Sequence, residues 1–192
     1  RHIGLACLPY GDIDAAVAEV HRVARRGGLR GLALSCSWDM EPMWHPCWEP
    51  MWKAVADVNL PLHFHTFPTT APRAKEVDSA KVRRAAMFTG VSAFQMGLIH
   101  ILAAMMGAGV FERYPNLRVS FGESGIGWIP YLLERSDYSH EQHHVWTHSK
   151  QYLEAGMKPS DVFRRQIYSC FIDDAYGLKN LDQIGEDKVM YE

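Results

Sequence analysis

The amino-acid sequence predicts an α/β fold in which a parallel sheet packs against helices. Short apolar runs, typical of buried strands, alternate along the chain with segments whose apolar residues recur at helical spacing. The predicted strands show no clean polar–apolar alternation, which is typical of a sheet buried on both faces. An open doubly wound sheet and a closed β/α barrel both fit this pattern. No Gly-x-Gly-x-x-Gly turn follows the first strand to favour a dinucleotide-binding fold.

Six strands and the helices between them are predicted in chain order. Asp12 is the expected N-cap of the first helix, which Gly27 and Gly28 should end. Pro50 suits the first turn of the second helix. The strands are expected at 3–9, 29–34, 60–65, 117–122, 166–172 and 188–191, and the later helices at 50–59, about 81–107, 128–136 and 176–184.

The apolar segment 92–111 is about long enough to cross a bilayer, which takes roughly twenty residues. However, it contains Gln95, His100 and three glycines, and Glu112 and Arg113 follow it directly. Its bulky residues recur near the helical period. We therefore expect a buried helix of a soluble protein and no membrane partner.

The composition is that of an ordinary globular protein. The net charge is −2 and the pI is near 6.6. The sequence therefore has no excess of positive charge that would predict binding to nucleic acid or to an anionic membrane. The four cysteines form no Cys-x-x-Cys pair, which argues against a disulfide framework and against a zinc ribbon. Reduced thiols and the lack of a visible signal peptide predict a cytoplasmic protein.

A barrel would be incomplete in this chain. Eight strands and some 250 residues are typical of a full barrel, whereas about six strands are predicted here. Arg1 leads directly into a strand, and no helix follows the last one. We expect residues 1–192 to form a single, partial barrel domain that lacks the first strand or strands and the end of the last strand.

Two histidines end the third predicted strand. His63 and His65 are two residues apart, so both side chains point the same way. The carboxyl ends of the strands are where a parallel barrel carries its active site, and imidazole is the commonest protein ligand for zinc. His65 is therefore a candidate metal ligand. Two packed, hydrogen-bonded histidines near a core explain the pattern equally well.

Carboxylates follow the fourth and fifth strands. Glu123 could be a metal ligand or a general base acting on a metal-bound water. The alternative is a carboxylate at a helix start, satisfied by backbone N–H groups. For Asp173 and Asp174 the sequence favours this second interpretation. The histidines at 140, 143, 144 and 148 form no His-Glu-x-x-His motif, which favours a solvated loop or interface segment over a second metal site.

The segments LPLHFH (60–65), GVFERYPNLRV (109–119) and FGESGIGWIPY (121–131) together resemble the amidohydrolase-related family. This branch of the amidohydrolase superfamily includes aminocarboxymuconate-semialdehyde decarboxylase and resorcylate-type decarboxylases. The segment IGEDKVMYE (184–192) looks like the approach to the last barrel strand of this family. The resemblance covers essentially the whole chain, and 109–131 is its most specific part.

The resemblance implies a distorted (β/α)8 barrel with one divalent metal, usually zinc. Its ligands come from an acidic-or-His-x-His pair on the first strand, a histidine that ends the fifth and an aspartate that ends the eighth. The fifth-strand histidine falls on His65. The other ligands are expected upstream of Arg1 and just beyond Glu192. Many members have a histidine where this sequence has Glu123. This difference weakens the inference that the chain shares the decarboxylase activity of those members, and it leaves hydrolysis or hydration open.

We expect an enzyme in which a metal-activated water attacks a small carboxylate, lactone or amide substrate, with His65 holding the metal and Glu123 as general base. The alternative is non-oxidative decarboxylation of an aromatic or muconate-type acid, with Glu123 or His63 moving the proton. A catalytically silent fragment or scaffold is the third interpretation. Barrels of this family often dimerise, and the loop 38–52 offers apolar surface for a homodimer or for the active-site mouth.

Overall fold

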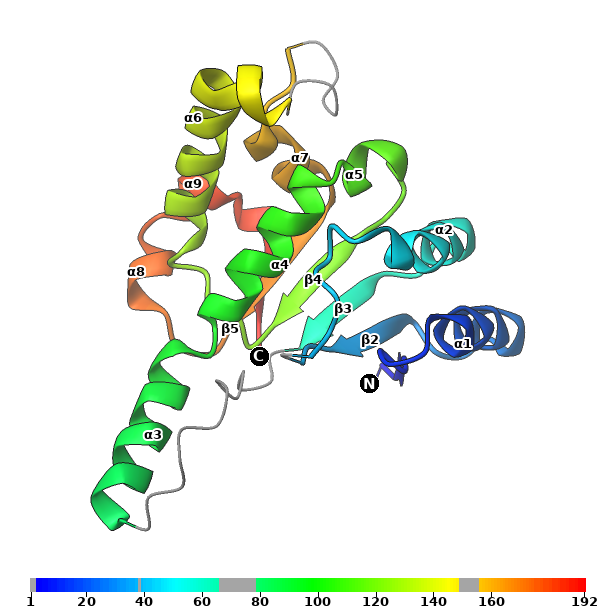
Figure 1. The fold of residues 1–192 in the computed structure, drawn as a ribbon, viewed down its shortest axis with the longest axis horizontal. Helices are drawn as coiled ribbons and strands as arrows, with labels where there is room; N and C mark the ends of the chain where they lie inside the picture. Colours follow the sequence, from blue (N-terminus) through cyan, green and yellow to red (C-terminus); the bar gives the residue numbers. More distant parts are fainter. Residues whose placement is uncertain (1–2, 38, 66–78, 149–155) are drawn as a thin grey trace.

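A six-stranded parallel sheet forms the centre of the computed structural model, which describes residues 3–37, 39–65, 79–148 and 156–192 (Figure 1). Each strand pairs with the next along the chain, in the order β1 to β6. A doubly wound sheet would reverse its strand order part-way, whereas a barrel wall does not. The sheet confirms the predicted α/β fold and all six strands, which are β1 (Leu5–Cys7), β2 (Gly31–Ser35), β3 (Leu62–His65), β4 (Val119–Gly122), β5 (Ile167–Phe171) and β6 (Val189–Tyr191).

The two faces of the sheet differ in what they carry. Residues two apart on a strand share a face, and the register pairs His63 with Ser120 and His65 with Gly122. These residues lie on the face opposite the main apolar core. The core face carries fully buried side chains from four neighbouring strands, namely Leu32, Leu34, Leu62, Phe64, Val119, Phe121 and Ile167.

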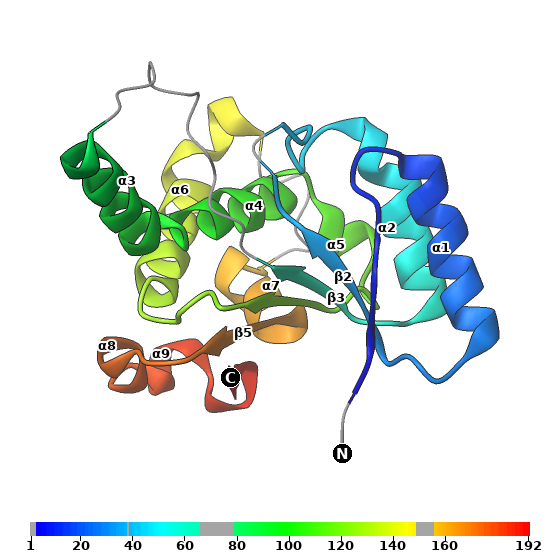
Figure 2. The same cartoon turned by 90° about the horizontal axis from the view of Figure 1, so that it is seen from below.

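Helices α1 (Ile13–Arg26) and α2 (Glu49–Val58) lie side by side in both views (Figures 1 and 2). Asp12 caps α1 as predicted, because its Oδ1 accepts the N–H of Ala15 at 2.9 Å. Gly27 ends α1 with a positive φ of 69°. Pro50 lies in the first turn of α2, and Asn59 ends that helix in the left-handed conformation. Both helix predictions are confirmed.

The predicted helix 81–107 is two helices in the structure. α3 (Ala80–Ala93) and α4 (Met96–Gly107) meet at a bend of 41°. The expected burial of segment 92–111 is confirmed on α4, which buries Leu98, Leu102 and Met105, whereas α3 buries none of its residues and lies at the edge of the molecule (Figures 1 and 2). No single helix in the described ranges has the length and apolar character to cross a membrane; the bent pair meets that test by length and composition only.

The remaining elements correct the sequence analysis at several points. The helix predicted at 128–136 continues to Thr147, so the histidines at 140, 143 and 144 lie on a helix. The solvated loop is therefore wrong, whereas the alternative of an interface segment stays a prediction. The helix predicted at 176–184 is two short helices, and one helix after Pro159 was missed because its sequence is mostly polar. These elements are α5 (Val110–Arg113), α6 (Ile129–Thr147), α7 (Pro159–Gln166), α8 (Ala175–Leu178), α9 (Leu181–Ile184) and the 3-10 helices η1 (Pro46–Trp48) and η3 (Glu186–Lys188).

The Trp-, Pro- and Met-rich segment 38–52 contributes mainly to the core. Trp48, Met51 and Trp52 are buried, and Trp44 is the large apolar residue of this segment that remains strongly exposed, at 59%. Trp38 lies outside the described residues. The predicted apolar surface is therefore wrong for most of this segment, because η1 and α2 turn its large side chains inward. The homodimer stays a prediction.

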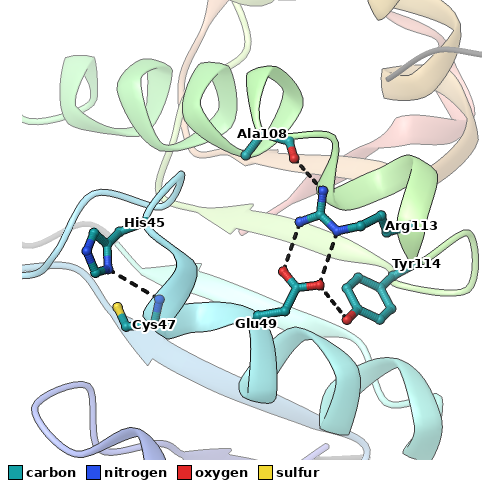
Figure 3. Close-up of polar contacts among 6 residues, drawn as sticks. All are labelled: His45, Cys47, Glu49, Ala108, Arg113 and Tyr114. Atoms are coloured by element: carbon teal, nitrogen blue, oxygen red, sulfur yellow. Dashed lines mark hydrogen bonds and ion pairs between the residues drawn. The ribbon is translucent and has the colours of Figure 1, made fainter. Parts of the chain in front are cut away.

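Glu49, at the start of α2, ties that helix to α5 (Figure 3). Arg113 donates to the two carboxylate oxygens at 3.1 and 2.9 Å, and the hydroxyl of Tyr114 donates to Oε1 at 2.7 Å. The hydrogen bond from Arg113 is the main cause that lowers the pKa of Glu49. Burial, together with Glu49, raises the pKa of Tyr114 to about 12. Arg113 and Tyr114 thus hold the start of α2 against the end of α5.

We expect Glu49→Gln to lower the free energy of unfolding at pH 7 by about 1 kcal/mol, since the pair is charge-assisted but half exposed. The folded-state pKa of Glu49 is lowered, so its contribution is complete above its ordinary value of 4.5 and is lost as the pH falls through the folded value. Urea unfolding should therefore show a smaller difference at about pH 3.5 than at pH 7. Asp57→Asn, which removes a single exposed ion pair with Lys53 on the same helix, is the control. An equal loss in that variant would contradict the prediction.

Candidate active site

The carboxyl ends of β3 and β4 bring two of the predicted site residues together. His65 is the last residue of β3, and Glu123 directly follows β4. The Nε2 atom of His65 lies 3.9 Å from Oε2 of Glu123, and the two side chains are 50% and 45% exposed. An imidazole and a carboxylate therefore approach each other at the surface of the described part of the chain, each about half exposed.

His63 lies deeper on the same strand. Its Nδ1 is hydrogen-bonded to the hydroxyl of Ser120 on β4. On the other side, a Cβ atom at Gly31 of β2 would stand 2.9 Å from Nε2 of His63, so this imidazole needs a glycine there. Burial lowers the pKa of His63, and the negative charge of Glu192 partly offsets this. His63 has the packed, hydrogen-bonded arrangement that the sequence left open for both histidines.

Glu123 holds an unusual backbone conformation. In the described parts of the chain, the non-glycine residues with positive φ are Asn59, Glu123 and His148. Asn59 and His148 end helices, where the left-handed conformation is common. Glu123, at φ 48°, instead joins a strand to a loop. Such a conformation persists only where the surroundings hold it, and it is enriched at functional sites.

Hydrogen bonds hold the Glu123 peptide groups from two sides. The N–H of Glu123 donates to Oε2 of Glu192 at 2.7 Å, and its carbonyl accepts from Nε2 of Gln95 at 3.3 Å. Gln95 immediately precedes α4, and Glu192 immediately follows β6. Two segments distant in sequence therefore fix the backbone from which the Glu123 side chain projects.

Asp174 holds the next turn of the same loop. Its Oδ2 accepts the N–H groups of Ile126 and Gly127 at 2.7 Å each, and its Oδ1 accepts that of Gly177 at 2.7 Å. Burial acts to raise the pKa of Asp174, but the three N–H donors outweigh it and the pKa is lowered. Asp174 is thus a helix-start carboxylate, as the sequence suggested. It, and not Glu123, satisfies the backbone N–H groups before α6.

A cavity of about 290 Å³ lies between the segment after β2 and α4. One of its wall residues, Cys36, is next to the end of β3, because its N–H donates to the carbonyl of His65 at 3.2 Å. His65 and Glu123 are not among the wall residues. Burial raises the pKa of Cys36 to about 12, so its thiol stays protonated at neutral pH. The walls come from the segment after β2 and from α4, and are Cys36, Ser37, Met40, Glu41, Pro42, Met43, Trp44, His100, Ile101 and Ala104.

The donor atoms suit a divalent metal in type. Imidazole nitrogen and carboxylate oxygen are the donors that zinc and manganese share, and His65 and Glu123 present one of each. Among the described residues, however, no group of three or more His, Cys, Asp or Glu side chains is arranged to hold a metal. The ligands expected upstream of Arg1 and beyond Glu192 stay predictions.

Sequence analysis missed two residues that hold this site, Glu192 and Gln95. Glu192 is recognised only through the β5–β6 register, which places it beside the end of β5. Gln95 appeared as a polar interruption of an apolar helix. The break between α3 and α4 at this position explains its role, because it brings the amide to the Glu123 carbonyl.

Comparison with known proteins gives matches over the whole chain. The family model described as Amidohydrolase matches residues 1–192. Gamma-resorcylate decarboxylase from Polaromonas sp. is 25% identical over 206 residues, in an alignment that covers 100% of this chain and 59% of that protein. The chain therefore spans less than two thirds of this relative.

Solved structures share the fold. The crystal structure of 5-carboxyvanillate decarboxylase from Sphingomonas paucimobilis superimposes with a TM-score of 0.76 at 24% identity, over 100% of this chain and 55% of that one. A dihydroxybenzoic acid decarboxylase from Polaromonas sp. JS666, with bound manganese and the inhibitor 2-nitroresorcinol, gives 0.71 at 22% identity, over 100% and 58%. At these identities the similarity establishes the barrel-type fold alone.

We expect Asp174→Asn to lower the free energy of unfolding by about 2 kcal/mol at pH 7, because an amide cannot accept all three N–H groups. The lowered pKa means that the wild-type contribution is complete above the ordinary value of 3.8 and is lost as the pH falls through the folded value. Thermal or urea unfolding against pH measures this. Asp173→Asn, at the exposed neighbouring position, is the matched control and should change little. Equal effects of the two variants would refute the role of Asp174.

Proposed function

Because the chain belongs to the amidohydrolase family, whose model covers all 192 residues, we propose that the protein is a metal-dependent enzyme that removes the carboxyl group of an aromatic acid without oxidation. The observation that carries the proposal is the approach of Glu123 to His65 at the strand ends. The relatives' names support it, since they are decarboxylases of hydroxylated aromatic acids. Hydrolysis, the first expectation from the sequence, becomes the second candidate.

His65 would hold the divalent metal through Nε2 of its half-exposed side chain at the end of β3. A metal bound there supplies Lewis-acid polarisation of substrate oxygen atoms. The sequence favoured zinc, and the structure of the Polaromonas sp. JS666 relative contains manganese. We propose one divalent ion, and elemental analysis of the purified protein identifies which.

Glu123 is proposed to deliver the proton. Loss of CO2 from an aromatic acid requires protonation of the ring carbon that bears the carboxylate. The bond between that carbon and the carboxylate then breaks, and its electron pair restores the aromatic ring. The Glu123 carboxyl can serve because it is half exposed beside His65. His63 is the second candidate, but Ser120 engages its Nδ1 and its ring packs over Gly31.

The cavity beside Cys36 suits an aromatic substrate. Met40, Met43 and Ile101 offer apolar contacts, and His100 with Glu41 adds polar groups at its wall. Its volume of about 290 Å³ is at the lower end of the range for small-molecule sites. A small aromatic acid could place its ring there and its carboxylate toward His65. A small-molecule substrate is thus part of the proposal, whereas the lack of nucleic-acid and membrane partners and the cytoplasmic location stay predictions.

Metal-dependent hydrolysis is the second candidate, and Glu123 is the observation that favours it. A carboxylate beside a metal ligand can accept a proton from the water that attacks an ester, lactone or amide. The two reactions use the same residues, so their products decide between them.

The full-length protein, loaded with manganese or zinc, should convert a dihydroxybenzoate or 5-carboxyvanillate to the corresponding phenol and CO2. His65→Ala should lose bound metal, and its activity should fall by about 10³-fold or more because a metal ligand is gone. His143→Ala, on the far part of α6, is the control histidine and should keep both. Activity only on esters, lactones or amides would favour hydrolysis. The absence of stoichiometric metal and of all activity would favour a silent scaffold.

Glu123→Gln should lower kcat by about 10²- to 10⁴-fold, the usual contribution of a general acid or base. The variant should keep its loop conformation, because the bonds to the Glu123 peptide groups do not involve the side chain. Its metal content is measured beside kcat, because a loss of metal would make Glu123 a ligand and not the proton carrier. Decarboxylation by the wild-type protein in D2O should place one deuterium on the carbon that lost CO2. Glu134→Gln, at an exposed site on α6, is the matched control. An unchanged kcat in Glu123→Gln would exclude Glu123 as the proton carrier.

A further inference from the structure

Glu192 lies at the same strand ends as His65 and Glu123, and the proposed function leaves it without a role. Its backbone N–H donates to the carbonyl of Phe171 at 3.0 Å, so the residue continues β6 alongside β5. Its side chain then crosses the end of β5, and Oε2 accepts the N–H of Glu123 at 2.7 Å. The C-terminal end of the chain lies beside β5 in both views (Figures 1 and 2).

The path of this side chain depends on Gly122. A Cβ atom at Gly122 would stand 3.3 Å from Oε1 of Glu192 and 3.7 Å from Cδ2 of His65. The first distance is tighter than ordinary van der Waals contact. A side chain at the end of β4 would therefore press on the Glu192 carboxylate, which would have to shift by a few tenths of an ångström.

The surroundings place the Glu192 carboxylate among the groups of the candidate site. Its charge acts on His63, and it adds to burial in raising the pKa of Cys170 to about 12. Its bond to the Glu123 amide joins β6 to the end of β4 across β5. One carboxylate thus joins the ends of two strands that are not neighbours in the sheet.

The hydrogen bond from the Glu123 N–H to Glu192 affects the candidate site, because it helps to fix the backbone conformation of Glu123. A left-handed backbone is unfavourable for a residue with a side chain. Among the described non-glycine residues with positive φ, Glu123 is the one that does not end a helix. Gln95 holds its carbonyl and Glu192 holds its N–H. Without the second bond the turn can relax to a commoner conformation, which would swing the Glu123 carboxyl away from His65.

We propose that Glu192 is a positioning residue, whose carboxylate holds the Glu123 amide and thereby aims the Glu123 side chain at His65. The bond requires an acceptor oxygen at the right reach. It does not require a negative charge. The kinetic consequence rests on the proposed function, whereas the effect on the Glu123 amide does not.

Three substitutions in the full-length protein separate reach from charge. Glu192→Gln keeps the length and an acceptor oxygen but removes the charge. Glu192→Asp keeps the charge but is one methylene shorter, and Glu192→Ala removes both. Glu186→Ala, an exposed carboxylate in η3 of the same segment, is the matched control.

Amide hydrogen exchange of Glu123, followed by NMR on protein labelled at glutamate nitrogen, is the direct readout. We expect exchange to be at least about tenfold faster in Glu192→Asp and Glu192→Ala, and within about threefold of wild type in Glu192→Gln and Glu186→Ala. With a dihydroxybenzoate as substrate, kcat should fall by about tenfold or more in the Asp and Ala variants, with KM and metal content nearly unchanged. Glu192→Gln should keep most of kcat.

Either of two results overturns the proposal. One is unchanged Glu123 exchange in both Asp and Ala variants. The other is the reverse order, in which Asp behaves as wild type and Gln as Ala, because charge and not reach would then matter. If Ala fails to fold, the Asp–Gln comparison still decides. If no substrate is turned over by wild type, the proposed function fails, and the exchange rates alone judge the positioning role.

Discussion

The register of the parallel sheet is the constraint on which the candidate site depends. Phe64 and Phe121, paired across β3 and β4, stack at 5.5 Å between ring centroids within the apolar core. This pairing leaves His65 opposite Gly122 on the other face. A slip by one residue would turn the imidazoles into the core and expose the phenylalanines. The burial of two aromatic rings therefore specifies where the candidate ligand stands.

Three carboxylates near these strand ends have different roles because their partners differ. Asp174 accepts three backbone N–H groups and is thereby committed to the loop before α6. Glu192 accepts the amide of Glu123 and is committed to the turn after β4. The Glu123 carboxyl is the one that faces His65. Two carboxylates thus stabilise backbone that would otherwise leave polar groups unsatisfied, which orients the third for chemistry.

Local signals explain how much the sequence could predict. The strands, the Asp12 cap and Pro50 in α2 depend on neighbours in sequence, and each was found. The meeting of His65 with Glu123 followed from the rule that strand ends share one edge. The break at Gln95 and the reach of Glu192 depend on contacts 28 and 69 residues away, so no local pattern carried them. The different surroundings of His63 and His65 required Gly31 and Ser120, on neighbouring strands.

The chemistry of a carboxyl beside an imidazole does not by itself choose between giving and taking a proton. The neighbouring cavity bears on that choice, because its walls include Met40, Met43 and Ile101. These residues offer apolar contacts to a ring, and Glu41 and His100 in the same walls can bind hydroxyl groups on it. In our proposal, a ring in that cavity directs its carboxylate toward His65 and the carbon that bears it toward Glu123, because the wall residue Cys36 is hydrogen-bonded to the backbone carbonyl of His65. The same carboxyl would then be better placed to protonate carbon than to activate water, which is why decarboxylation precedes hydrolysis in our proposal.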